Sequence, residues 1–412
     1  RNAVFDQFQR WHPRQFKDHG VRIIDIDDRS LAELGQWPWP RTKVAELVQR
    51  LHDAGAASIG FDVMFSEADR TSPRAMLRSW KLTSAAAGVL AMLPDHDQVF
   101  AQALRGNHVV LGFAAIHAAR QTDASLPPPA FGTVFRGPAP DTLPTFQSAI
   151  LPLPALVSAA AGVGAMTFVP DADGVVRRVP LMLRIGDALL PTLAAESLRV
   201  ARNEHNFLIQ SDAHGAVERF AIGSLVIPTT PSGEVWVHFT RPQAQRSISA
   251  ADVLANRVEP GALRGAMVLI GASAQGLQDL RFSPLGGIIP GVEVHAQMLE
   301  QTLAGTFLNR PAWALSFEAL VILLGGLLLC ALALNAGAML SALLALLLIG
   351  GLNWGAWHAF VDYRLLLDPL TASLALALVY VASSLVRHLA SERKQRWVRS
   401  AFSRYVSPNL VD

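Results

Sequence analysis

The chain has 412 residues, which is enough for two or three folding units of roughly 150 residues each. Hydrophobic residues make up 51% of it and charged residues only 17%, whereas a soluble domain carries about 25% charged residues. The net charge of +2, without a basic stripe interleaved with aromatic residues, argues against a nucleic-acid-binding protein. The single cysteine, Cys330, excludes an intrachain disulfide, and an exported domain without disulfides is typical of a bacterial envelope.

Strand and helix patterns alternate through much of residues 1–310. The expected strands lie at residues 21–26, 58–65, 108–116 and 266–271, and the expected helices at residues 31–34, 42–54, 97–104 and 291–303. This succession predicts a mainly parallel sheet covered by helices.

The middle of this part is less regular. Residues 127–154 are rich in proline and are expected to form a loop, while residues 71–94 follow no pattern that we can assign. Residues 175–183 and 224–239 resemble strands of hairpins, which predicts an antiparallel portion. We therefore expect residues 1–310 to form an α/β domain with a mixed sheet.

Polar side chains follow several of the predicted strands. In an open α/β sheet, ligands bind beyond the carboxyl ends of the strands, so these side chains are the candidate site. The candidate ligand-binding residues are Asp25, Asp27, Asp62, Glu67, Asp69, Asp279 and Arg281. They are expected to converge on one cleft that binds a cation or a basic ligand. The alternative for each acid is a structural role, because Asp28 and Ser30 are natural N-caps for the helix at residues 31–34.

Motifs for catalysis are absent from the sequence. It contains no phosphate-binding Gly-Lys-Ser/Thr loop, no Gly-x-Ser-x-Gly elbow and no His-Glu-x-x-His helix. Residues 171–174 imitate the start of a calcium loop, but the twelfth position is Met182, and a turn at Asp173-Gly174 explains them better. Glu293 and His295 have no spaced ligand partner, so core or cap roles are favoured. We predict no catalytic residue, no metal ligand and no cofactor in this chain.

The C-terminal third is a membrane region, expected to cover residues 311–386. The sequence has no Asp, Glu, Lys or Arg from residue 319 to residue 361, a stretch about twice the roughly 20 residues that cross a bilayer. A turn signal at Asn335-Ala336-Gly337 divides it into spans at residues 314–334 and 338–357, and a third span follows at residues 366–386. The sequence therefore predicts three transmembrane helices.

The positive residues indicate the orientation of these spans. The third span is followed by Arg387, Arg393, Lys394, Arg396, Arg399 and Arg404. Only Arg364 lies between the second and third spans, so the positive-inside rule places residues 387–412 in the cytoplasm. Three spans then place residues 1–310 outside the cell. Glu318 lies about one turn inside the first span, and either reaches the outer interface or is a functional intramembrane carboxylate.

Several short strings together identify a family resemblance. The most specific is Gly35-Gln36-Trp37-Pro38-Trp39-Pro40-Arg41. The others are residues 24–31, 60–67, 69–70, 171–178, 269–271, 276–279, 283–285 and 290–296. Over most of residues 20–305 the chain resembles the type 2 CHASE domain, an extracellular sensory module of cyclases and histidine kinases. The resemblance implies three helices after the sensor, in agreement with the spans above, and an anchor helix before it. Because the chain opens at Arg1 without a hydrophobic signal, we expect that exporting anchor upstream.

The resemblance also implies an output domain after the third span. Residues 401–408 are similar to the segment that leads into class III adenylate/guanylate cyclase domains. We therefore expect the sensory and transmembrane part of a bacterial inner-membrane receptor for an unknown extracytoplasmic signal. Its cytoplasmic cyclase, absent from this chain, would make cAMP from ATP with a divalent metal. The alternatives are the sensor of a histidine kinase or another output enzyme, and a membrane-tethered metal-dependent hydrolase with a cation at Asp25, Asp27 and Asp62.

Class III cyclases form their active sites between two catalytic domains, which favours a homodimer. Residues 386–406 are expected to extend the third span as a linker helix with a partial apolar stripe. That stripe consists of Leu389, Trp397, Val398, Phe402 and Tyr405. It predicts pairing with a second subunit, through which the helix transmits a rotation or a shift.

Overall fold

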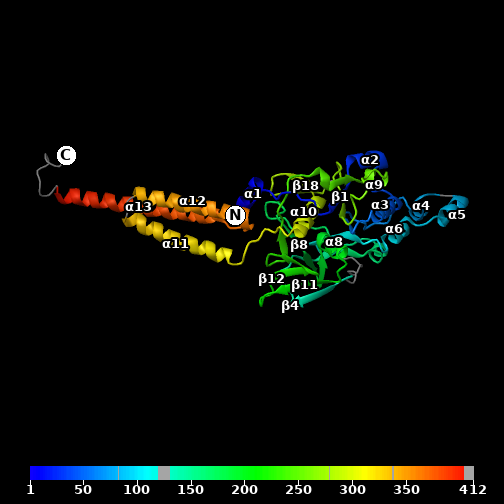
Figure 1. Cartoon of the computed structure of the whole chain (residues 1–412), viewed down its shortest axis with the longest axis horizontal. Coiled ribbons are helices and arrows are strands. Elements are labelled where there is room, and N and C mark those ends of the chain that lie inside the picture. The colour runs from blue at the N-terminus through cyan, green and yellow to red at the C-terminus, as the bar shows by residue number, and fades with distance from the viewer. Residues whose placement is uncertain (82, 119–129, 278, 336–337, 403–412) are drawn as a thin grey trace. The chain divides into compact units, whose positions relative to one another are not determined.

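The computed structural model describes residues 1–81, 83–118, 130–277, 279–335 and 338–402. The chain folds into two compact units (Figure 1). Pro13–Leu308 forms the α/β unit, and Arg1–His12 together with Asn309–Asp412 forms the helical unit. We expected the outer domain to cover residues 1–310, but the structure assigns the first twelve residues to the helical unit.

The α/β unit is built on a central sheet. Its strand order is β15-β1-β16-β2-β3-β6, and β7 also pairs with β3. The bounds are Val21–Ile26 for β1, Ser58–Phe61 for β2, Val109–Ile116 for β3, Ser148–Ile150 for β6, Gly162–Ala165 for β7, Ser247–Ser249 for β15 and Met267–Ala272 for β16. All these pairings are parallel except that of β3 with β6. The predicted mainly parallel sheet is therefore confirmed.

Helices cover both faces of this sheet. Those on one face are α2 (Asp28–Leu34), α3 (Arg41–Asp53), α6 (His96–Leu104), α7 (Pro154–Val157) and α9 (Ala250–Leu254), and those on the other are α8 (Leu193–Ala201) and α10 (Gly291–Ala304). Ile24 and Ile26 of β1 face the first group, whereas Val21 and Ile23 face the second. Successive side chains of a strand point to opposite faces, so a strand covered on both sides is mostly apolar.

Short strands complete the unit, and they pair antiparallel except that β4 is parallel to β11 and β5 is parallel to β9. One sheet has the order β13-β12-β11-β4, a second has β10-β9-β5, and β14 pairs with β8 and β17 with β18. The bounds are Gly132–Arg136 for β4, Thr145–Phe146 for β5, Arg178–Pro180 for β8, Met182–Ile185 for β9, Ala188–Pro191 for β10, Asn206–Ser211 for β11, Val217–Ile222 for β12, Leu225–Pro228 for β13, Glu234–Trp236 for β14, Leu280–Phe282 for β17 and Ile288–Pro290 for β18. The expected antiparallel portion is confirmed. The expected loop at residues 127–154 is wrong, because its described part contains β4, β5 and β6.

Several segments gain structure that the sequence patterns did not predict, among them the helix α8. Two further helices are α4 (Pro73–Ser79) and α5 (Ser84–Met92), and a 3-10 turn, η1, covers Ala244–Arg246. Residues Trp37–Trp39 lie in the bend between α2 and α3. Trp39 is almost fully buried, and its Nε1 donates a hydrogen bond to the Gly35 carbonyl at 2.7 Å.

The helical unit contains α1 (Asn2–Trp11), α11 (Ala314–Asn335), α12 (Ala338–Tyr363) and α13 (Pro369–Phe402). Among the described residues, three helices are long and apolar enough to cross a membrane, at Ala314–Asn335, Met339–Tyr363 and Pro369–Val398. The three predicted spans are therefore confirmed in number, with α12 longer than expected. Phe8 of α1 lies 5.5 Å from the Trp357 ring and 5.4 Å from the Phe360 ring, measured between centroids, and this aromatic packing joins α1 to the helical unit.

The carboxylate near the start of α11 has a structural role. Both Nη atoms of Arg310 donate to the Glu318 carboxylate, at 3.0 and 2.9 Å, and the Asp368 N–H donates to the same carboxylate at 2.7 Å. Glu318 thus ties the start of α11 to the turn between α12 and α13. The turn expected at residues 335–337 lies partly outside the described residues.

We expect Gly164→Ala to destabilise the protein by about 1–3 kcal/mol, the usual range for overpacking. A Cβ at this position in β7 would lie 2.5 Å from the Leu193 Cα, and backbone atoms cannot move aside as a flexible side chain does. Chemical denaturation in detergent, followed by circular dichroism, measures the change. The control is Gly88→Ala in α5, where a Cβ meets nothing within 4 Å. Equal losses at the two positions would contradict this account of the packing.

Candidate functional site

The carboxyl ends of β1, β16 and β2 lie side by side in the sheet. Asp25 is in register with Gly271, and Ile270 with Phe61, so Gly271 lies between Asp25 and the residue that follows β2, Asp62. A Cβ on Gly271 would meet the Val292 side chain at 2.5 Å, which places this face of the edge against α10. Asp25 and Asp62 therefore share one face of the sheet, as expected from the sequence.

Asp25 joins two strands. Its carboxylate accepts hydrogen bonds from the Ser273 N–H at 3.0 Å and from the Ser273 hydroxyl at 2.6 Å. Burial raises the pKa of Asp25 above its usual value, and the bonds from Ser273 oppose this effect. Both carboxylate oxygens are thus used to hold the segment after β16 against β1.

Asp27 and Asp28 hold the turn into α2. The Asp27 carboxylate accepts from the Ser30 N–H at 2.8 Å and from the Ser249 hydroxyl at 2.9 Å. Burial raises the pKa of Asp27, but these hydrogen bonds outweigh it and leave the pKa below its usual value. Asp28 accepts from the Gln275 N–H at 3.0 Å. Asp27 is therefore the N-cap of α2. The expectation that Asp28 and Ser30 cap this helix is wrong, because both residues lie inside it.

Asp62, Asp279 and Arg281 form a second group on this edge. Arg281 donates to the Asp279 carboxylate at 2.5 Å, and its guanidinium lies 5.7 Å from the Phe168 ring centroid. Burial raises the pKa of Asp62 to about 7 from an ordinary value of 3.8, with a further increase from Asp279 and a decrease from Arg281. The Gly291 N–H, at the start of α10, donates to the Asp279 carbonyl at 2.7 Å. Asp62 thus lies close enough to Asp279 and Arg281 for their charges to change its pKa.

His295 belongs to the core behind this group. It is fully buried on α10, and its ring lies 4.5 Å from the Phe168 ring between centroids. Burial lowers the pKa of His295 to about 3, so the ring is neutral at physiological pH. The core role favoured for His295 is therefore confirmed.

Asp69 and Glu67 lie elsewhere. The Asp69 carboxylate accepts from the Arg41 N–H at 2.8 Å, from the Thr71 hydroxyl at 2.8 Å, and pairs with His96 Nδ1 at 3.1 Å, beside α3 and α6. Burial raises the pKa of Asp69, but these hydrogen bonds outweigh it and lower the pKa. Glu67 is exposed. The convergence of all seven candidates on one cleft is therefore wrong, because α3 and α6 cover the opposite face of the sheet from α10.

Metal-binding geometry is not found among the candidates. Within residues 1–81, 83–118, 130–277, 279–335 and 338–402, no group of three or more His, Cys, Asp or Glu side chains lies close enough to hold a metal ion. The carboxylates of the turn at residues 171–174, which imitates the start of a calcium loop, form ion pairs with arginine instead. Arg177 pairs with Asp171 at 2.7 Å and with Asp173 at 2.6 Å, and the pKa of Asp173 is lowered to about 2 mainly by the hydrogen bond from Arg177.

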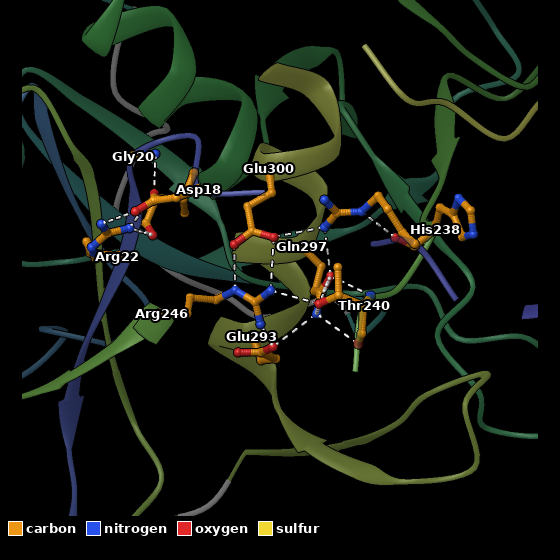
Figure 2. A network of polar contacts seen from close by, with 11 residues as sticks. Asp18, Gly20, Arg22, His238, Thr240, Arg246, Glu293, Gln297 and Glu300 are labelled. Atoms are coloured by element: carbon orange, nitrogen blue, oxygen red, sulfur yellow. Dashed lines mark hydrogen bonds and ion pairs between the residues drawn. The ribbon is translucent and has the colours of Figure 1, made fainter. Parts of the chain in front are cut away.

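A buried ionic network lies along α10 and was not predicted from the sequence (Figure 2). Its acceptors on α10 are Glu293, Gln297 and Glu300, spaced so that they share one face of the helix. Arg246, at the end of η1, donates to Glu300 at 2.6 and 2.9 Å and also binds Glu293. The same guanidinium donates to the Thr240 hydroxyl at 2.8 Å.

Arg14 closes the network from the beginning of the α/β unit. It donates to Glu300 at 2.9 Å, to the Gln297 side chain at 3.0 Å and to the His238 carbonyl at 2.9 Å. The side chains of Arg14, Arg246 and Glu300 are at most 4% exposed. Burial lowers the pKa of Arg14 and raises the pKa of Glu293. In both residues burial disfavours the charged form, and the ion pairs of the network favour it. The feature of the sequence that could have indicated this network is the row of polar residues on the otherwise apolar helix α10.

Comparison with known protein families gives a match over more than half of the chain. The family model described as CHASE2 domain matches residues 1–333 of the chain. No curated protein and no solved structure matches it.

We expect Asp62→Asn to stabilise the protein at pH 8 and to change little near pH 4. The raised pKa means that the folded state holds this proton more tightly than the unfolded state. The stability associated with the protonated carboxyl is therefore complete below pH 4 and is lost as the pH rises toward 7. At about 1.4 kcal/mol per pKa unit, the full shift corresponds to roughly 4 kcal/mol as an upper bound.

Chemical denaturation of both proteins over a pH series measures this difference. Asp173→Asn is the control with the opposite sign, because the pKa of Asp173 is lowered and its contribution to stability appears only above the unfolded pKa. A difference between Asp62→Asn and the parent protein that does not vary with pH would contradict the titration of Asp62.

We expect Glu300→Ala to destabilise the protein by about 3–5 kcal/mol, because it leaves two buried guanidinium groups without their shared carboxylate. Thermal and chemical denaturation test this. The control is Glu46→Ala, which removes an exposed pair with Arg50 and should cost less than about 1 kcal/mol. A small effect at Glu300 would show that water replaces the carboxylate.

Proposed function

Because the chain belongs to the CHASE2 domain family, we propose that it is the sensory and transmembrane part of a bacterial receptor that regulates a cytoplasmic class III cyclase. A CHASE2 domain is an extracellular sensory domain, and the match over residues 1–333 is the observation that carries the proposal. The three apolar helices α11, α12 and α13 are consistent with a sensor joined to the membrane.

The helix α10 is suited to carry a signal out of the sensor. Its first turn starts at Gly291, whose N–H is bound to Asp279, next to the titrating Asp62. Its C-terminal half is held by Arg14 and Arg246 through Glu300. The helix ends at Gly305, in a left-handed conformation, shortly before the helical unit begins at Asn309. A ligand or proton that changes the Asp62 group therefore acts on the helix that leads to the membrane spans.

The helix α13 is suited to carry the signal onward. It runs without interruption from Pro369 to Phe402, or about 51 Å at 1.5 Å per residue, while the hydrocarbon core of a bilayer is about 30 Å thick. Past the apolar part, Arg387 donates to the Ala333 carbonyl at 2.9 Å and so ties α13 to the end of α11. The helix thus connects the membrane to the linker as one element.

We infer that the output end of α13 lies in the cytoplasm, on the inner side of the bacterial inner membrane. The positive residues that follow Val386 support this orientation by the positive-inside rule, and residues 13–308 are then periplasmic. Leu389, Trp397 and Val398 are exposed on α13, which supports pairing with a second copy of the chain. Tyr405 of the expected stripe lies outside the described residues.

A cyclase output is supported by residues 401–408, of which 403–408 lie outside the described residues. A histidine kinase or another output enzyme would be driven by the same helix, so the choice of output rests on this segment alone. In the part of the chain that the structure describes, Asp25 and Asp27 use their oxygens for serine hydroxyls and backbone N–H groups, which argues against a tethered hydrolase with a cation there.

We expect one alanine inserted after Arg393 to change the output of a chimera in which the chain is joined after Phe402 to a class III cyclase catalytic domain. One residue rotates the following helix by about 100° relative to the membrane spans, whereas seven residues rotate it by only about 20°. The measurement is cAMP formed in a bacterial strain without its own cyclase.

The seven-residue insertion is the matched control and should restore most of the parent activity. The sensor should stay folded in all three proteins, as limited proteolysis of the α/β unit reports. Equal cAMP synthesis in all three proteins would exclude helix α13 as the relay.

A further inference from the structure

The helices α4 and α5 form a hairpin that projects from the α/β unit beyond α3 and α6 (Figure 1). In the part of the chain that the structure describes, α5 buries none of its side chains. The exposed fractions are 61% for Trp80, 65% for Val89, 88% for Met92 and 50% for Leu93. Large apolar side chains gathered on one projection indicate an interaction surface.

The pattern of α5 indicates what kind of surface this is. The helix reads Ser-Ala-Ala-Ala-Gly-Val-Leu-Ala-Met, apolar all round rather than on one stripe. A helix that lies in the groove of a protein partner keeps a polar face toward water. A helix that is apolar on every side fits an apolar medium that surrounds it, such as the acyl region of a lipid layer.

The charges of the hairpin point in the same direction. The basic residues of this segment are Arg70, Arg74, Arg78 and Lys81, and the sequence has no Asp or Glu from residue 70 to residue 94. Arg74 also pairs with Asp95 at the base of the hairpin, at 3.4 Å. Trp80 lies between Arg78 and Lys81, and tryptophan beside basic residues is typical of a segment at a membrane interface.

The same charges disfavour a second copy of the chain as the occupant. Two hairpins brought together would place like charges against each other, which costs free energy. An anionic surface instead attracts every basic residue of the segment.

We propose that the hairpin of α4 and α5 docks on an anionic lipid surface. In this arrangement α5 and Trp80 enter the boundary between headgroups and acyl chains, and Arg78 and Lys81 face the lipid phosphates. This activity is separate from the proposed signalling role, because it uses neither the Asp62 group nor α10.

The test uses the full chain held in nanodiscs of phosphatidylcholine, mixed with vesicles of phosphatidylcholine alone or with phosphatidylglycerol. Cys330→Ala with Met92→Cys allows an environment-sensitive fluorophore to be attached to α5. We expect co-flotation with the phosphatidylglycerol vesicles, a rise in fluorescence, and weaker binding at high salt.

Two variants change the hairpin at exposed positions, so they leave the fold intact. Val89→Asp with Met92→Asp removes the apolar tip, and Arg78→Glu with Lys81→Glu reverses the charge. Each pair should weaken binding by about tenfold or more. Val226→Asp is the matched control, since Val226 is 52% exposed on β13 in the same unit and should leave binding unchanged.

Three results would overturn the proposal. The first is no binding to anionic vesicles, and the second is equal binding to both kinds of vesicle. The third is that the nanodiscs associate with one another and do not bind vesicles, and that Val89→Asp with Met92→Asp abolishes this self-association. That result would assign the hairpin to a second copy of the chain.

Discussion

The fold of the α/β unit depends on the buried carboxylate of Glu300, which is shared by Arg14 and Arg246. A buried charge without a partner is costly, so these three side chains are stable only when all of them are in place. Arg14 lies near the first residue of the unit, and Glu300 lies near the end of its last helix. The network therefore couples the start of the sensory unit to its end, across 286 residues of chain.

The helix α10 has different surroundings at its first turn and at Glu300. Its first turn borders Asp62, Asp279 and Arg281, a group that responds to protons and charge. Glu293 then hydrogen-bonds Gln297 at 3.0 Å and also binds Arg246, so the first turn and the ionic network share a side chain. The first turn of α10 therefore contacts Asp279 through the Gly291 N–H and contacts the ionic network through Glu293.

The central sheet could be predicted from sequence because its strands are apolar on both faces and its helices have regular apolar spacing. β4 was missed because it is mostly exposed and lies in a proline-rich segment. The hairpin of α4 and α5 was missed because a helix that is apolar all round has no period to detect.

The site was predicted only in part, for a geometric reason. Asp25 and Asp62 follow strands that are neighbours of β16, and simple register places them on one face. Beyond Asp62 the chain turns, and Phe65 enters the core on the side of α3, which carries Asp69 to the other face. The ionic network combines residues from distant parts of the chain, and no local pattern reveals such pairs.

The uninterrupted length of α13 has a consequence for the linker beyond the bilayer. A short isolated helix in water is only marginally stable, chiefly because its first turn is difficult to nucleate. The apolar part of α13 supplies that nucleus, so the charged part after Arg387 needs only to propagate a helix that already exists. Helical order then weakens with distance from the bilayer, which limits how far along the linker a rotation of the span stays coherent.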